Sequence, residues 1–384
     1  MAILLKNASV FDGETFLNGH MVEIADGKIV RLISGSDQFD QNAYDQVIDL
    51  EGQVLAPGFV DVQVNGGGGI MFNDQRNVEG LTEIVRGHRQ YGSTTLMPTL
   101  ITDSFEVMCE AADAIGTAIK AGVPGVRGVH FEGPYLSLKR RGVHAPEFLR
   151  QVDADAFDLF TRGDLGKVIV TVAPECVPKD FIANLSEKGV HVCAGHSAAT
   201  YEQVGEALDV GLRGFTHLFN AMPPLANREP SVVGAGLDDP NSWCGLIVDG
   251  YHLHFASARI VVRAKKQGKI MLVSDAMATV GAKEKHFNLY GETIHAVDGR
   301  CALEDGTLAG SDLDMMRAVE LTHKELGVEL GEALRMAALY PAEFLQLDDQ
   351  IGRITPGFDA DLVAFGKDDM KVTQTWIKGE GEAH

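Results

Sequence analysis

The amino-acid sequence predicts an α/β fold: a (β/α)8 TIM-type barrel with a small β-sandwich domain built from both chain termini. Two observations carry this prediction. Short apolar runs recur eight times in the central part of the chain with helical patterns between them, which is typical of parallel βα units. Segments that alternate apolar and polar residues occur at the two ends, outside this repeat. A doubly wound open sheet is the alternative fold.

The first 55 residues consist of short β segments separated by turns. One example is Lys28–Ile33, which follows the hairpin signal Asp26-Gly27. Such a strip is too small to form a stable core alone, and strand patterns return at 356–365 and 372–377. We therefore predict a small β-sandwich domain from residues 1–55 and 350–384 and a barrel domain from residues 56–349.

The barrel domain contains the predicted strands and helices in alternation. The eight strands are Phe59–Val64, Thr94–Leu100, Val126–Glu132, Val168–Ala173, His191–His196, Gly214–Leu218, Cys244–Asp249 and Ile270–Asp275. Helices are expected over 75–91, 103–121, 199–210, 255–267, 312–326 and 331–346. Residues 285–305 are rich in His, Tyr, Thr and Val and predict a β insertion after the eighth strand.

Composition narrows the class of protein. The net charge of −21 over 384 residues argues against a nucleic-acid partner. No run approaches the roughly 18 apolar residues of a membrane span, and the N-terminus lacks the basic start of a signal peptide. The five cysteines form no CxxC pair, which favours reduced thiols. We predict a cytoplasmic protein without a membrane partner.

Four of the predicted strands end in residues that suit metal chemistry: Glu132, His196, His217 and Asp275. The carboxyl ends of barrel strands meet at one face, where active sites lie. One carboxylate and two imidazoles form the ligand set of a catalytic zinc, and iron or cobalt also suits it. Asp275 is then the general base and acid. Each residue alone would be read as a buried polar group, and it is the repetition that favours a site.

Other candidates lie in the loops that follow these strands. His252 follows the seventh strand and is predicted to polarise a substrate carbonyl, with His254 as a competitor for the role. Asn220 and Arg228 lie in the loop after His217. Arginine suits phosphate binding, although an isolated loop arginine is usually solvated. The basic turn at 139–144 is either a solvated loop or a lid or phosphate contact.

Several sequence motifs resemble the amidohydrolase superfamily and, within it, the N-acetylglucosamine-6-phosphate deacetylase family. The pieces PGFVD at 57–61 and PGFDADLVAF at 356–365 are common to many amidohydrolases. More specific to the deacetylases are HFEGPY at 130–135, AGHS at 194–197 and THLFNAMP at 216–223. The resemblance covers essentially the whole chain.

The resemblance implies hydrolysis of the acetamide of N-acetylglucosamine 6-phosphate to glucosamine 6-phosphate and acetate. It implies that Glu132, His196 and His217 bind the metal, that Asp275 moves the proton, and that His252 contacts the N-acetyl carbonyl. The implied substrate contacts are Val143, His144, Asn220, Ala221, Arg228, Leu308, Ala309 and Gly310. It also implies a homodimer whose phosphate pocket takes a residue from the neighbouring subunit, for which His144 is the candidate.

The chain departs from the superfamily pattern at one place. Most amidohydrolases carry a His-x-His pair at the end of strand one for a second metal, whereas Gln63 and Asn65 stand here. Neutral amides are poor ligands for zinc-like ions, and strand four ends in Ala173-Pro174-Glu175, with no lysine there to act as a bridge. We predict one divalent metal per subunit, Zn2+ first, with Fe2+, Co2+ or Mn2+ compatible. The alternatives are another single-metal amidohydrolase, such as a deaminase or a deacetylase of another amino sugar, and a non-catalytic scaffold.

Overall fold

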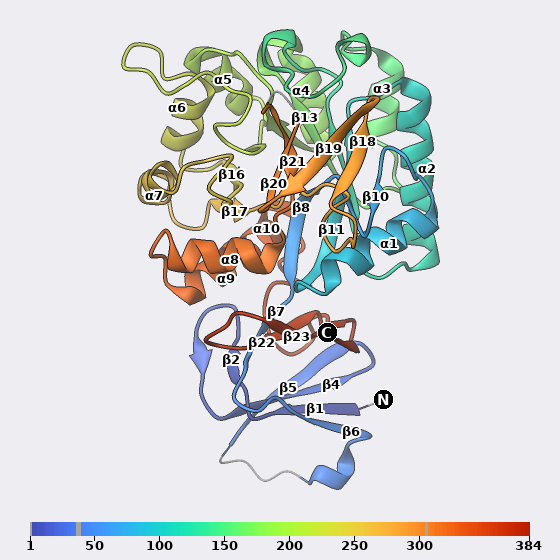
Figure 1. Ribbon diagram of the computed structural model, residues 1–384, viewed down its shortest axis with the longest axis vertical. Coiled ribbons are helices and arrows are strands. Elements are labelled where there is room, and N and C mark those ends of the chain that lie inside the picture. The colour runs from blue at the N-terminus through green and yellow to red at the C-terminus, as the bar shows by residue number, and fades with distance from the viewer. Residues whose placement is uncertain (1, 36–39, 304–305) are drawn as a thin grey trace. The chain divides into compact units, whose positions relative to one another are not determined.

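The computed structural model describes residues 2–35, 40–303 and 306–384, which form two compact units. The first unit contains Met1–Asp61, His88–Thr95 and Asp314–His384. The second unit contains Val62–Gly87 and Leu96–Leu313. Figure 1 shows the course of the chain.

The first unit contains two β-sheets. The four-stranded sheet has the order β5 (Lys28–Ser34), β4 (His20–Ala25), β1 (Ala2–Lys6) and β6 (Gln46–Asp49). The six-stranded sheet has the order β24 (Glu380–Ala383), β23 (Val372–Ile377), β22 (Leu362–Phe365), β7 (Val54–Pro57), β2 (Ser9–Phe11) and β3 (Phe16–Leu17). In Figure 1, red strands from the C-terminal end lie beside blue strands from the N-terminal end.

Both chain ends share one core in this unit. β22 pairs antiparallel with β7, and the buried side chains of Leu5, Val22, Leu55, Leu362 and Trp376 belong to one apolar cluster. Neither end supplies enough apolar surface alone, so each sheet face is buried only when the other end is present. The predicted β-sandwich from both termini is confirmed, while its boundaries at 55 and 350 stay a prediction.

Three helices of the first unit follow the central part of the chain: α8 (Met315–Lys324), α9 (Leu330–Ala337) and α10 (Leu339–Leu345). A single helix over 331–346 was expected, but the chain breaks at Ala338, where φ is −128°. Pro341 lies in the following turn and has no N–H to donate to Ala337, which favours a new start over a continued helix.

The second unit is built around a parallel eight-stranded sheet. Its strands are β8 (Phe59–Val64), β11 (Ser93–Ile101), β12 (Gly128–Glu132), β13 (Lys167–Val172), β14 (His191–Ala194), β15 (Gly214–Phe215), β16 (Trp243–Leu246) and β17 (Ile270–Leu272), in sheet order. The segment after β17 returns to β8: Val64 bridges Ala276 in parallel, and Asp275 N donates to Gln63 O at 3.0 Å. These contacts close the sheet, and the predicted barrel is confirmed.

Helices follow the strands, as the alternation predicts. They are α1 (Val78–Arg89), α2 (Phe105–Ala121), α3 (Ala154–Phe160), α4 (Lys179–Glu187), α5 (Tyr201–Asp209), α6 (Ser231–Asp238) and α7 (Phe255–Ala264). The prediction omitted α3, α4 and α6. The helix α6 is apolar and its first six residues are buried, so it shows no amphipathic period. The other two are short.

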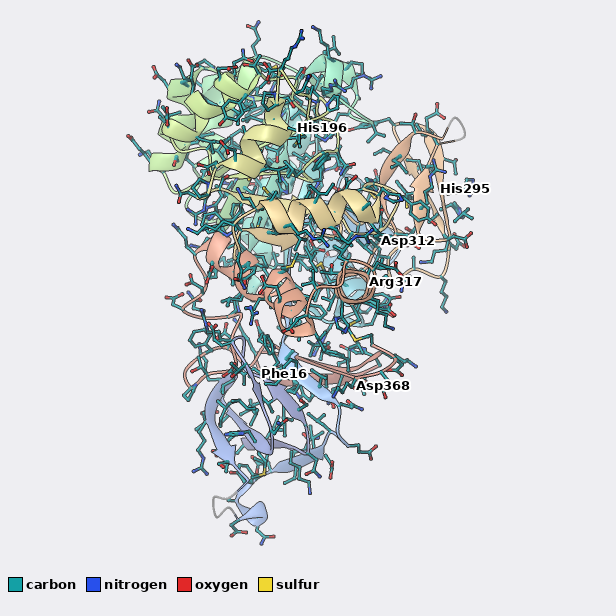
Figure 2. All side chains as sticks on the ribbon, turned by 90° about the vertical axis from the view of Figure 1, so that its left-hand side faces the viewer. Phe16, His196, His295, Asp312, Arg317 and Asp368 are labelled. Carbon is teal, nitrogen blue, oxygen red and sulfur yellow. The ribbon has the colours of Figure 1, made fainter. Side chains whose placement is uncertain are left out.

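The predicted β insertion is an antiparallel sheet of β18 (His286–Leu289), β19 (Glu292–Val297), β20 (Arg300–Ala302) and β21 (Leu308–Ser311). The expected range ended at 305, and positions 304–305 lie outside the described residues. One side of the insertion is apolar: Phe287, Leu289 and Ile294 share a core with Met277 and Ala309. Figure 2 labels His295 on this insertion.

Shorter elements complete the described chain. They are η1 (Gln41–Ala43), β9 (Gly66–Gly67), β10 (Ile70–Met71), η2 (Leu138–Arg140), η3 (Pro146–Phe148) and η4 (Pro174–Cys176). Among the residues that the structure describes, no helix is long and apolar enough to cross a membrane.

Candidate active site

The four predicted residues lie at the carboxyl ends of barrel strands. Glu132 is the last residue of β12, whereas His196, His217 and Asp275 follow two or three residues after the ends of β14, β15 and β17. The strands were expected to include these three. They end earlier because His196, His217 and Asp275 have φ of 47°, 33° and 52°, in the left-handed region. Such strain is concentrated at functional sites, and it turns all three side chains out of the pleat.

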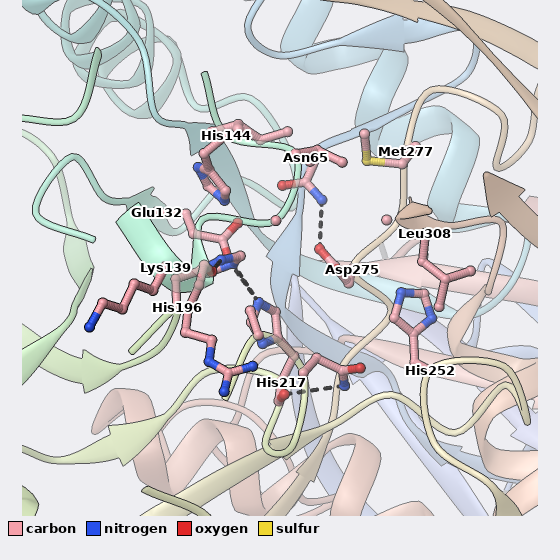
Figure 3. Close-up of a pocket in the computed structure, with 17 residues that line it drawn as sticks. Asn65, Glu132, Lys139, His144, His196, His217, His252, Asp275, Met277 and Leu308 are labelled. Carbon is pink, nitrogen blue, oxygen red and sulfur yellow. Dashed lines mark hydrogen bonds and ion pairs between the residues drawn. The ribbon is translucent and has the colours of Figure 1, made fainter. Parts of the chain in front are cut away.

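Glu132, His196 and His217 form a compact buried group (Figure 3). The Nε2 atom of His217 lies 3.0 Å from Oε1 of Glu132 and 3.0 Å from Nε2 of His196. His196 Nε2 lies 3.2 Å from the same Glu132 oxygen. Ligand atoms about 2.0–2.2 Å from a tetrahedral zinc lie roughly 3.4 Å from one another. The donor set and its spacing therefore fit a metal ion.

The ring of His196 is oriented by the backbone of residues 137–140. Its Nδ1 donates to the backbone oxygen of Arg140 at 2.9 Å, and its own carbonyl accepts from Ser137 N at 2.9 Å. With the proton on Nδ1, the lone pair is on Nε2, which faces Glu132. Such hydrogen bonds from the far ring nitrogen are the usual way in which proteins fix a metal-binding histidine.

Amide groups of Gln63 and Asn65 hold the two buried carboxylates. Gln63 Nε2 donates to Glu132 Oε1 at 3.2 Å and to Asp275 Oδ1 at 3.0 Å. Asn65 Nδ2 donates to the same Asp275 oxygen at 2.7 Å (Figure 3). These N–H groups point at the two carboxylates, so their hydrogen bonds offset part of the negative charge of the pair.

The two carboxylates differ in their affinity for a proton. Burial raises the pKa of Asp275, and the neighbouring charge of Glu132 raises it further. Burial alone would also raise the pKa of Glu132, but hydrogen bonds from His196 and His217 outweigh it and hold that pKa well below its usual value. Paired acids with separated pKa values can divide their roles, and here the separation favours the ionised form of Glu132 and makes Asp275 the better proton acceptor.

His252 is held by Asp249, which lies three residues after the end of β16. Its Nδ1 lies 2.6 Å from Oδ2 of Asp249, and the backbone N–H groups of Tyr251 and His252 donate to Oδ1 at 2.8 Å. His252 lines the cavity. His254 is exposed, and its Nδ1 accepts from Ala256 N at the start of α7. The structure therefore assigns the cavity position to His252 and a helix cap to His254.

The cavity has a volume of about 310 Å³ and contains most of the predicted substrate contacts. Those that line it are Val143, His144, Asn220, Ala221, Leu308 and Gly310. Two predicted contacts do not line it: Ala309 is buried beside it, and Arg228 is exposed on the loop before α6.

His144 is buried in the cavity wall of its own chain. Its ring centroid lies 4.3 Å from that of His196, and its Nδ1 pairs with Thr102 Oγ1 at 2.9 Å. Burial, followed by the influence of His196, lowers the pKa of His144 to about 3. The ring is therefore neutral at physiological pH. Its expected role in the phosphate pocket of a neighbouring subunit stays a prediction.

Other lining residues include three from the basic turn at 139–144, for which a phosphate contact was one of the predicted roles, and two that were not predicted. They are Ile101, Lys139, Arg140, Gly142 and Met277. For Lys139 and Arg140 a signal was present, since two adjacent cations are unusual in so acidic a chain. Ile101 and Met277 carry no such signal, because a cavity-lining apolar residue cannot be told from a core residue by sequence.

A closed parallel barrel that gathers a carboxylate, two imidazoles and a buried aspartate at its strand ends defines a metal-dependent hydrolase. A family model described as "Amidohydrolase family" matches residues 54–380. The chain belongs to the amidohydrolase family.

Individual relatives show which amidohydrolases the chain resembles. An N-acetylgalactosamine-6-phosphate deacetylase from Shewanella sp. (strain ANA-3) is 42% identical over 94% of this chain and 90% of the relative. The crystal structure of N-acetylglucosamine-6-phosphate deacetylase from Pasteurella multocida has a TM-score of 0.95 at 34% identity, covering 100% of both chains. A Mycobacterium smegmatis N-acetylglucosamine-6-phosphate deacetylase in complex with N-acetyl-D-glucosamine-6-phosphate has a TM-score of 0.90 at 31% identity, covering 99% of each chain. The resemblance to these deacetylases is confirmed.

Proposed function

We propose that this chain hydrolyses the N-acetyl group of N-acetylglucosamine 6-phosphate, giving glucosamine 6-phosphate and acetate. The observation that carries the proposal is the convergence of Glu132, His196 and His217 beside Asp275 and His252 in one cavity. The names of the relatives supply the substrate class.

Glu132, His196 and His217 are the proposed ligands of one divalent metal per subunit. Zn2+ suits the nitrogen and oxygen donors best, and Fe2+, Co2+ or Mn2+ is compatible with them. When bound, such an ion supplies Lewis acidity and lowers the pKa of water. The amides of Gln63 and Asn65 support a count of one, because their N–H groups point at the carboxylates where a second cation would lie.

Asp275 and His252 are the proposed proton-transfer and polarising groups. Asp275 takes a proton as water adds to the amide carbonyl, and returns it to the departing nitrogen. The raised pKa of Asp275 suits both halves of this task. When both nitrogens of His252 carry protons, Nδ1–H is held by Asp249, which leaves Nε2–H to stabilise the carbonyl oxygen as it gains charge.

The rest of the cavity is proposed to hold the sugar phosphate. Val143, His144, Asn220, Ala221, Leu308 and Gly310 line it, with Ala309 directly behind. Lys139 and Arg140 add positive charge to the same wall, which suits a phosphate. Arg228 is retained as a phosphate contact; because it is exposed outside the cavity of its own chain, that contact requires a second copy of the chain in a homodimer.

The test is acetate release from N-acetylglucosamine 6-phosphate and from unphosphorylated N-acetylglucosamine, by chelated enzyme with and without added zinc. Zinc-dependent turnover of the phosphorylated sugar alone is expected. Equal turnover of both sugars would remove the phosphate from the proposal. An Asp275→Asn variant that kept both its metal and wild-type turnover would overturn the mechanism.

N-acetylgalactosamine 6-phosphate is the second candidate substrate, because the 42% identical relative is named for it. The two sugars differ only in the configuration of one ring hydroxyl, remote from the acetamide chemistry. Comparing kcat/KM for both decides between them. A cytoplasmic location and a homodimer complete the proposal, and cell fractionation and light scattering test them.

A further inference from the structure

Two histidines face each other across the exposed hairpin of the β insertion. In the register of β18 and β19, His286 is opposite His295. Tyr290 and Gly291 form the two-residue turn, with φ of 49° and 85°, the left-handed pair that a tight hairpin prefers. The neighbouring position is hydrogen-bonded, since Ala296 N donates to Lys285 O at 2.8 Å. The histidines therefore occupy a non-hydrogen-bonded pair, in which opposed side chains lie closest.

The distance between the two rings suits a shared ion. Their centroids are 5.9 Å apart and the ring planes are 35° from parallel. An imidazole that binds zinc through one nitrogen has its ring centre about 3.2 Å from the metal, so two such rings lie roughly 5–6 Å apart. Both histidines are exposed, and neither lines the active-site cavity.

A carboxylate stands next to His286. Oε2 of Glu284 lies 3.7 Å from Nε2 of His286, and its side chain is 82% exposed. An exposed glutamate can turn toward an ion held by the two rings. The three side chains would then offer two imidazoles and one carboxylate, a set suited to late first-row divalent metals.

The backbone beneath the pair is fixed, which matters for chelation. On the opposite face of the same two strands, Phe287 and Ile294 are buried in a core that also contains Cys301 and Ala309. The strands therefore do not have to be brought together when an ion binds, and the ordering cost of the second ligand is small.

We propose that His286 and His295 form a second divalent-metal site on this chain, with Glu284 as a third ligand, that takes Zn2+, Ni2+ or Cu2+. The site shares no residue with the Glu132–His196–His217 group. It is exposed and lies outside the cavity, whereas that group is buried in the cavity wall. An ion there ties β18 to β19. It does not depend on the proposed substrate, because none of its residues belongs to the cavity.

The test is zinc stoichiometry by equilibrium dialysis on the full chain, first loaded with one equivalent of zinc. The wild type is expected to bind a second equivalent, and His295→Thr is expected to bind only one. Threonine favours strands, so the hairpin is retained while the imidazole is lost. Thr293→Ala changes the same face of β19, two residues away, and is expected to keep both equivalents.

Glu284→Gln tests the third ligand, and a dissociation constant for the second equivalent raised about tenfold would support it. A wild type that binds one equivalent, or a His295→Thr variant that binds two, would overturn the site. Acetate release is measured on each protein alongside. Loss of the second equivalent with unchanged turnover separates this site from the proposed active site, so the failure of either proposal is recognised independently.

Discussion

His252 and His254 are two positions apart in the same loop, yet only one of them faces the cavity. We expect His252→Asn to lower kcat by about 10²–10⁴-fold, the usual range for loss of a group that stabilises or protonates a transition state. His254→Asn should leave kcat within about twofold of the wild type, because that ring only caps α7. Steady-state kinetics on both variants checks this, and similar losses in the two would contradict the assignment.

Asp249 acts on the reaction only through His252. In Asp249→Asn, the NH2 group of the amide must point either at Nδ1–H of His252 or at the backbone N–H groups of Tyr251 and His252. In either orientation a donor faces a donor, so a hydrogen bond is lost. We expect kcat to fall about 10–100-fold with full metal content. Asp298→Asn, in an exposed turn, is the control. If kcat were unchanged in both variants, the ring of His252 would not need Asp249.

At the scale of single residues, the sequence predicts which side chains come together in the site but not their backbone conformation. Glu132, His196, His217 and Asp275 were predictable because each follows an apolar run, and parallel strands must bring such ends together. The left-handed backbone at His196 and His217 was not, since these residues carry no local signal for a positive φ. The position of Arg228 outside the cavity was equally hidden, because a loop's path depends on tertiary contacts rather than on its own composition.

Among the helices, α6 and α7 are tied by a buried lysine. Lys265, at the end of α7, donates through Nζ to the backbone oxygens of Gly236 and Asp239 and to Oγ of Ser242. Its exposure is only 3%, and burial lowers its pKa. These bonds satisfy carbonyls at the end of α6 that have no partner within the helix.

We expect Lys265→Met to lower the free energy of unfolding by about 1–3 kcal/mol, because it removes the lysine donor from Asp239 O and leaves Gly236 O with only the weak thiol donor of Cys244. Lys266→Met, at the exposed neighbouring position, should stay within about 0.5 kcal/mol of the wild type. Urea denaturation of the two variants measures the difference. Equal stabilities would show that the carbonyls find other donors.

At this scale the sequence predicted the alternation of strands and helices well and the lengths of the elements poorly. The strand β8 coincides with its prediction, since both of its faces are buried and every residue is compatible with a strand. Burial explains the missed helix α6 as well. An element buried all round loses the period that distinguishes a helix from a strand.

For the molecule as a whole, an ion bound by Glu132, His196 and His217 couples the active site to folding. It joins β12 to the segments after β14 and β15, and it binds only where those strand ends meet. At a free zinc concentration about 100 times the dissociation constant, the stabilisation is about 2.7 kcal/mol. We expect one equivalent of zinc to raise the Tm of chelated wild type by several degrees.

The matched control for this prediction is the double variant His217→Ala/His295→Thr, which lacks a ligand of each proposed zinc site. Its remaining ligands should bind zinc far more weakly, so one equivalent should leave the Tm of this variant unchanged. Differential scanning calorimetry with and without zinc measures both proteins. An equal rise in Tm in the two would place the stabilising ion elsewhere on the chain.

The strand β7 can pair with β22 only after the ribosome has synthesised almost the whole chain. In this pairing Leu55 is opposite Ala364, which follows it by 364 − 55 = 309 positions. At about 5–20 residues per second, a ribosome needs on the order of 15–60 s to pass from one strand to the other. Through that interval the edge of β7 has no β22 to pair with. A nascent chain that stalls before Leu362 therefore presents an open strand edge, which is a template for aggregation.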